Sequence, residues 1–166
     1  MGNALVLVDV DGVLNPRDRP HRGFKRHRCS PNGVTFKLWL NRAHGPLLSD
    51  LAAAAGAELA WASYWCDSAN EWIAPRVGLP ALPFVPIPRF PGPETGRTLG
   101  AWKARHVAAY AGARPFVWFE DEPDATECVA AEAGVGPHLL VAVDPVRGLT
   151  EAHLALAAAW LAEHGA

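Results

Sequence analysis

Short apolar runs alternate with amphipathic stretches along most of the chain. Apolar runs that stop at polar or glycine turns predict buried strands, here over residues 4–9, 57–62, 115–119 and 138–143. Periodic stretches with capping residues predict helices, here over 46–55, 67–76, 99–111, 123–133 and a last helix after Thr150. A regular alternation of strands and helices predicts an α/β fold, with a doubly wound, mostly parallel sheet between helical layers.

Two segments depart from this alternation. Residues 79–93 are rich in proline, and we expect only a short edge strand there, over 82–87. Residues 16–45 form an irregular insertion after the first strand, and 34–39 is the expected arm of a flap hairpin. The insertion is too short for a large cap domain.

The insertion is also locally basic. Six basic residues oppose the single acidic Asp18: Arg17, Arg19, Arg22, Lys25, Arg26 and Arg28. Such a block is typical of a solvated, mobile loop. The alternative interpretation is an electrostatic funnel that guides an anion, such as a nucleotide or a nucleic-acid end, to a site.

Composition narrows the class of protein. The 166 residues, half of them hydrophobic and 19% charged, suit a single globular domain over 1–166. A net charge of −2 argues against a generally basic nucleic-acid binder. Three widely spaced cysteines suggest no disulfide framework, so we expect a reducing, cytoplasmic location. Because the first strand begins early we expect no signal peptide, and no apolar run is long enough for a membrane span.

The first strand ends in Asp9 and Asp11, followed by Gly12. Alternate residues of an extended segment point the same way, so the two carboxylates should project together beyond the strand. Ligands of open α/β sheets bind at that end of the strands. Buried carboxylates are costly unless a hard cation or a covalent step uses them. A calcium loop is excluded, because Val13 and Leu14 occupy its fifth and sixth positions.

The run Asp9–Gly12 resembles the first of four signatures of the haloacid dehalogenase-like (HAD) superfamily. Ser63 after the second strand, Lys103 in the helix over 99–111, and an acidic cluster after the strand over 115–119 resemble the other three, in the same order. Relatives usually have two aspartates in the fourth signature, whereas this chain has Glu120 and Asp121.

The resemblance implies a Mg²⁺-dependent phosphohydrolase that acts through an aspartyl-phosphate. Asp9 is the implied nucleophile, and Asp11 the implied acid and then base. Ser63 would hydrogen-bond a phosphoryl oxygen, and Lys103 would neutralise charge in the transition state. Backbone amides of the turn near Gly12 would donate to the phosphate.

The implied ligands of Mg²⁺ are Asp9, the backbone carbonyl of Asp11, and Asp121 or Glu120. We expect Asp121 to be the ligand, with Glu120 as the other candidate. Glu122 and Asp124 would place negative charge at the start of the next helix, and Asp124 would hold a ligand or cap that helix.

The whole-chain pattern most resembles the small capless HAD domains associated with RNA-repair proteins, on the segments 61–63, 72–75 and 118–122. A capless, open site implies a large substrate or a partner that completes it. The expected binding partner is a phosphorylated small molecule or a nucleic-acid end. Trp61, Trp65 and Trp72 would either stack a base or line the core.

Two other functions stay open at this point. The unusual Glu120 motivates a binding module that holds a phosphorylated partner without turnover. A phosphotransferase would pass the phosphoryl group from Asp9 to an alcohol instead of water. The histidines show no zinc spacing, and neither a nucleophile elbow nor a P-loop occurs.

Overall fold

The computed structural model describes residues 3–18, 20 and 22–165. Four parallel strands form its main sheet: β1 (Leu5–Val8), β4 (Glu58–Trp61), β5 (Phe116–Glu120) and β6 (His138–Ala142). Their order is β4-β1-β5-β6, so β1 lies between two neighbours. In this register Val8 pairs with Trp61 on one side and with Phe119 on the other. The carboxyl ends of these three strands therefore meet at one edge.

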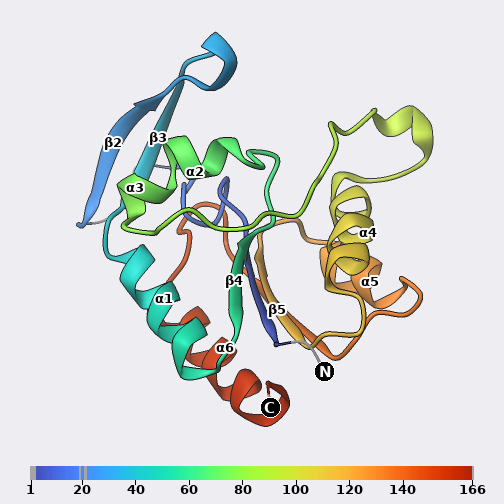
Figure 1. Cartoon of the computed structure of the whole chain (residues 1–166). Coiled ribbons are helices and arrows are strands. Elements are labelled where there is room, and N and C mark those ends of the chain that lie inside the picture. Colours follow the sequence, from blue (N-terminus) through green and yellow to red (C-terminus); the bar gives the residue numbers. More distant parts are fainter. Residues whose placement is uncertain (1–2, 19, 21, 166) are drawn as a thin grey trace.

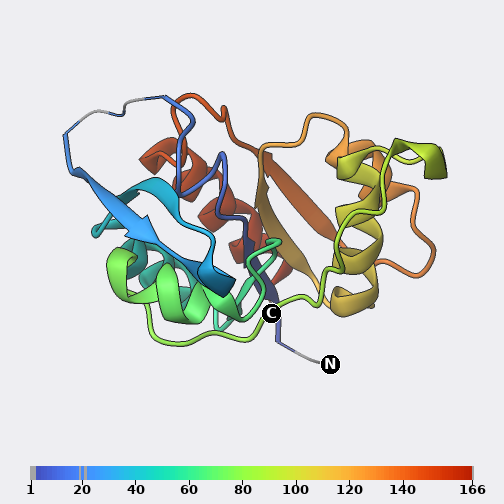
Figure 2. The same ribbon diagram turned by 90° about the horizontal axis from the view of Figure 1, so that it is seen from above.

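Helices cover both faces of this sheet. α1 (His44–Ala54) and α6 (Glu151–His164) pack on one face, while α4 (Leu99–Ala111) and α5 (Ala125–Ala130) pack on the other. Figure 2, viewed onto the carboxyl ends of the strands, shows these layers on opposite sides of the sheet. The predicted α/β fold with a doubly wound parallel sheet is confirmed, and the described residues contain no large cap.

The alternation of side chains along β1 explains the two layers. Val6 and Val8 belong to the core beneath α1 and α6. Leu5 and Leu7 belong to the core beneath α4 and α5. All four are fully buried, as expected for a strand with helices on both faces.

The insertion after β1 contains an antiparallel hairpin of β2 (Phe24–Cys29) and β3 (Phe36–Asn41), joined through a 3₁₀ turn, η1 (Pro31–Gly33). Figure 1 shows this hairpin projecting beyond the carboxyl ends of the main strands. The predicted flap arm is confirmed as β3. The mobile-loop interpretation is wrong for Lys25, Arg26 and Arg28, which lie on β2, while Arg19 falls outside the described residues.

Two predicted elements differ in the structure. The segment over 82–87 is no strand; Phe84 forms an isolated bridge to Trp61 at the edge of the sheet. Pro83 and Pro86 have no N–H to donate, so a regular ladder cannot continue there. The helix over 67–76 is divided into α2 (Ser68–Trp72) and α3 (Ala74–Val77), and Pro75 at the start of α3 cannot donate to the preceding turn.

The sequence also predicts helix caps by Thr150 and by Asp67; the first is confirmed and the second is wrong. Thr150 caps α6 as predicted, in a reciprocal capping box with His153. Asp67 precedes α2, but its side chain does not cap the helix. Its carboxylate instead accepts a hydrogen bond from Asn70 Nδ2 at 3.1 Å. The short 3₁₀ helix η2 (Pro93–Thr95) completes the elements. No helix in the described part of the chain is both long and apolar enough to cross a membrane.

Candidate active site

A buried lysine joins two carboxylates at the carboxyl end of the sheet. Lys103 Nζ lies 2.7 Å from Asp9 Oδ2 and also contacts Glu120 Oε2. The strand parity brings them together: Asp9 continues the face of Leu5 and Leu7, which lies under α4. Glu120 continues the face of Phe116 and Trp118 on β5 in the same way. All three side chains are almost fully buried.

The electrostatics of this cluster follow from burial and charge. Burial opposes the charge of Lys103, but the adjacent carboxylates of Asp9 and Glu120 outweigh it and raise the lysine pKa above its usual range. Burial and the negative charge of Asp9 raise the pKa of Glu120, against the attraction of Lys103. The ammonium is therefore a fixed positive charge inside the protein.

Three carboxylates lie close enough to share a cation. Asp9, Glu120 and Asp121 each offer one oxygen, and these atoms lie within 4.8 Å of one another. Carboxylate oxygens are the hard ligands that Mg²⁺ prefers, so this donor set fits the expected metal. Asp11 is not part of this cluster, and its backbone carbonyl as a ligand stays a prediction.

Glu120 and Asp121 differ in the contacts that their carboxylates already make within the protein. Glu120 Oε1 accepts hydrogen bonds from the backbone amides of Asp121 and Glu122, at 3.0 and 3.2 Å, and its other oxygen contacts Lys103. Asp121 Oδ2 instead accepts one from the exposed Arg17, at 3.0 Å. An exposed side chain is displaced more easily than buried groups, which favours Asp121 as the more available ligand.

The turn after β1 brings Gly12 against Asp121. Gly12 has a φ of +80°, and a Cβ at this position would lie 2.2 Å from Asp121 Oδ2. The turn uses its own amides: Gly12 N donates to Asn15 O at 2.9 Å, and Val13 N donates to Val10 O at 3.3 Å. The prediction that amides near Gly12 bind phosphate is therefore wrong for these two.

Asp11 is exposed and held by two side chains that sequence reasoning missed. Trp65 Nε1 donates to Asp11 Oδ2 at 2.9 Å, and Asn15 Nδ2 donates to Oδ1 at 2.9 Å. Asn15 Oδ1 in turn accepts from the backbone amide of Trp39 on β3, at 2.9 Å. The flap hairpin is thereby connected to Asp11 through a single side chain. Nothing in the spacing of the sequence signals the contact of Trp65.

Ser63 lies two residues after β4 and is buried. The amide of Ala62 donates to Val8 O at 2.9 Å, so the parallel register continues one residue beyond β4 and brings Ser63 to the same edge as Asp9. Ser63 Oγ accepts a weak hydrogen bond from the amide of Trp65, at 3.4 Å.

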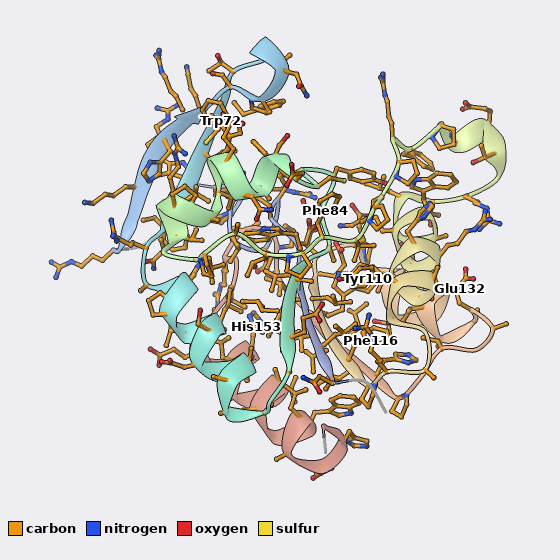
Figure 3. The ribbon with its side chains drawn as sticks, in the orientation of Figure 1. Trp72, Phe84, Tyr110, Phe116, Glu132 and His153 are labelled. Carbon is orange, nitrogen blue, oxygen red and sulfur yellow. The ribbon has the colours of Figure 1, made fainter. Side chains whose placement is uncertain are left out.

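The other predicted site residues lie apart from this cluster. Asp124 does not cap α5 through its side chain; it accepts a hydrogen bond from Thr98 Oγ1, at the start of α4. Trp61 is fully buried and donates to Asn70, which excludes it from base stacking and confirms the core interpretation. Trp72 lies on the hairpin side of α2 (Figure 3), with Arg76 over its ring.

An aromatic groove opens beside Asp11. Its volume is about 650 Å³, and it lies between the tip of the hairpin, the loop after β4 and Arg89. Its walls include Asp11, Phe36, Tyr64 and Trp65.

The sequence profile of the family described as "HAD domain in Swiss Army Knife RNA repair proteins" matches residues 5–154. The chain belongs to this family. The matched range includes the three-carboxylate cluster, Lys103 and Ser63. Membership in this HAD family indicates a function that is phosphohydrolase-type or associated with RNA repair. No curated protein matches the chain.

Proposed function

We propose that the protein is a Mg²⁺-dependent phosphohydrolase that cleaves a phosphomonoester through an aspartyl-phosphate on Asp9. The observation that carries this proposal is the buried contact of Lys103 with both Asp9 and Glu120. A buried ammonium beside a carboxylate provides fixed positive charge where an anionic phosphoryl group would react. The four HAD-like signatures of the chain thus supply groups that suit phosphoryl transfer.

Asp9 is suited to be the nucleophile because both of its oxygens are held. Oδ2 is paired with Lys103 at 2.7 Å, and Oδ1 accepts from the amide of Val10 at 2.8 Å. In the first step a bond forms between an Asp9 oxygen and phosphorus, and the bond from phosphorus to the leaving oxygen breaks. Asp11 gives its proton to that leaving oxygen.

The second step returns the enzyme to its starting state. Asp11 removes a proton from water, the water oxygen bonds to phosphorus, and the bond from phosphorus to Asp9 breaks to release inorganic phosphate. Lys103 stays charged throughout and stabilises the negative charge that develops. Ser63 lies at the same sheet edge and would hydrogen-bond a phosphoryl oxygen. The reacting groups bind only the phosphoryl group, so the proposal includes phosphorylated small molecules and nucleic-acid ends alike.

Asp9 and Asp121 would hold Mg²⁺, with Glu120 as the further carboxylate near it and the Asp11 carbonyl as the remaining protein ligand. When bound, the ion screens the repulsion between the Asp9 carboxylate and an anionic phosphoryl group. We also place the reaction in the cytoplasm. The three cysteines are free thiols, which suits a reducing compartment.

The test is phosphate release from an aryl phosphate and from a panel of phosphorylated nucleotides and oligonucleotides, with and without Mg²⁺. We expect Mg²⁺-dependent release that is lost in both Asp9→Asn and Asp11→Asn. No release by a folded protein that still binds Mg²⁺ would support the binding module instead. Phosphorylated products after addition of acceptor alcohols would identify a phosphotransferase.

A further inference from the structure

We infer that the aromatic groove beside Asp11 binds the nucleoside of the leaving group, with its base against the aromatic side chains and Arg89 near its next phosphate. This inference rests on the proposed function and specifies its substrate. Among the reacting groups only Asp11 lines this surface, and the inference assigns the groove to one chemical class: a nucleoside that carries a phosphate.

The position of the groove relative to the reacting groups makes it the place for a leaving group. Trp65, in its wall, donates to Asp11, the proposed donor of the proton to the leaving oxygen. Tyr64, also in its wall, lies against the buried cluster, because Lys103 Nζ is 5.9 Å from the centroid of its ring. A phosphoryl group that reaches Asp9 therefore has its ester oxygen directed toward this groove.

The walls of the groove are aromatic and exposed. Among the described residues, six large hydrophobic side chains are exposed, and three of them line this one groove: Val34, Phe36 and Tyr64. Phe36 and Trp65 meet edge to face, with ring centroids 5.6 Å apart, so they form a corner. Exposed aromatic surface in one patch marks a binding site, and aromatic faces of this kind stack nucleobases.

The shape of the corner is fixed before any ligand binds. The Trp65 indole is anchored by its hydrogen bond to Asp11, and Phe36 lies on β3, whose backbone is tied to Asn15. A pre-formed pocket loses less conformational entropy when a ligand binds. The volume of about 650 Å³ is also within the usual range of ligand sites.

Positive charge in the groove distinguishes a nucleotide with a second phosphate from an aryl phosphate. Arg89 lines the groove and also the adjoining cavity of about 390 Å³ with Tyr64 and Phe90. The outer face of the hairpin carries Arg26, Arg28 and Lys37, which line another small cavity. Guanidinium groups bind phosphates in a two-pronged geometry, so Arg89 in the wall of the aromatic groove suits a second phosphate.

The test measures kcat/KM of the full chain with Mg²⁺ on glycerol phosphate, nucleoside 3′- and 5′-monophosphates, oligonucleotides with a 3′ or 5′ phosphate, and a phosphotyrosyl peptide. We expect the nucleoside phosphates to exceed glycerol phosphate by about tenfold or more. Phe36→Ala and Tyr64→Leu should each reduce this preference by about fivefold. Leu156→Ala, an exposed apolar position on α6, is the matched control and should keep the preference.

Arg89→Ala separates the two sources of a nucleoside phosphate. A loss of activity on oligonucleotides that exceeds the loss on a nucleoside 3′,5′-bisphosphate identifies a polynucleotide end, and an equal loss on the two identifies a free nucleotide; mononucleotides, whose only phosphate reacts, should lose little. Both outcomes support the groove. Glycerol phosphate or the phosphotyrosyl peptide as the best substrate would overturn it, as would an unchanged preference in Phe36→Ala.

A binding measurement distinguishes failure of this inference from failure of the proposed hydrolysis. Asp9→Asn, titrated with adenosine monophosphate while tryptophan fluorescence is recorded, reports on the groove without turnover. Saturable quenching that Phe36→Ala weakens supports the groove even if no substrate is hydrolysed. Absence of quenching in that titration overturns the groove whether or not the protein releases phosphate from other esters.

Discussion

The indole N–H of Trp65 donates a hydrogen bond of 2.9 Å to Oδ2 of Asp11. Asn15 holds the other oxygen of the same carboxylate at 2.9 Å. The proposed acid and base is thus fixed by one residue of its own turn and one from the loop after β4. A carboxylate that is held at both oxygens keeps one orientation, and orientation is a large part of proton-transfer catalysis.

Replacing Trp65 with phenylalanine tests this positioning role. We expect kcat on a small aryl phosphate to fall by about tenfold or more, because misplacement of a catalytic group lowers the rate of reaction, while KM changes little. Trp72→Phe is the matched control, since Trp72 lies on α2 under Arg76, and it should keep the kcat. An unchanged kcat in Trp65→Phe would show that Asp11 needs no such anchor.

Gly12→Ala should weaken the binding of Mg²⁺. A Cβ at Gly12 would lie 2.2 Å from Asp121 Oδ2, so the carboxylate must move out of the three-carboxylate cluster. Titration calorimetry with Mg²⁺ measures the effect. The control is Gly56→Ala, which also has a positive φ, +59°, but has open space around the added Cβ. Both variants carry the backbone strain of about 1–3 kcal/mol, and only Gly12→Ala should lose metal affinity.

Lys103→Met should destabilise the fold as well as abolish activity. Removal of the ammonium leaves Asp9 and Glu120 as unpaired buried charges, which typically costs about 3–5 kcal/mol. The double variant Lys103→Met, Glu120→Gln removes one of these charges, so it should recover part of the free energy of unfolding in urea. Activity should not recover with it. A double variant no more stable than Lys103→Met would contradict the coupling of these two side chains.

Acid should destabilise the protein through His44 at the start of α1. Burial lowers the pKa of its imidazole from 6.5 to about 4. Between these values the unfolded chain takes up a proton that the folded chain does not. The neutral His44 therefore makes its full contribution to the free energy of unfolding above about pH 6.5. As the pH falls toward 4 the protein loses about 3 kcal/mol of that free energy.

Urea unfolding of the protein and of His44→Gln, at pH 7.5 and at pH 5, measures this contribution. The variant cannot take up that proton, so its stability should fall less between the two pH values. The acidic residues are common to both proteins, and their effects cancel in the comparison. Equal losses in both proteins would assign the acid sensitivity to other groups.

The sheet and the buried cluster were predictable because they follow from local rules. Local sequence patterns show the apolar strands, the helix caps and the four signatures. The alternation of side chains along β1 then directs Asp9 toward Lys103. The confirmed parts, the parallel sheet and the flap arm, rest on such patterns. β2 shows no such pattern. Its charged residues Lys25, Arg26 and Arg28 are typical of a loop, and they form a strand because β3 pairs with them.

The contacts that sequence reasoning missed depend on three-dimensional proximity. Trp65 and Asp11 are 54 residues apart, and Arg17 and Asp121 are 104 residues apart. No periodicity links such pairs. The expected cap by Asp124 is wrong for a similar reason: Asp124 directly precedes α5 in sequence, but its side-chain partner Thr98 stands at the start of α4.

The two oppositely charged residues of the buried pair, Asp9 and Lys103, are made far apart in time as the chain is synthesised. During synthesis Asp9 precedes its counter-ion, Lys103, by 94 residues. β1 likewise gains β5, its second neighbour, only after α4 has been made. A nascent or truncated chain that stops before α4 therefore has Asp9 without its lysine and without Glu120 and Asp121, and the proposed phosphatase activity should appear only once α4 and β5 have both been made.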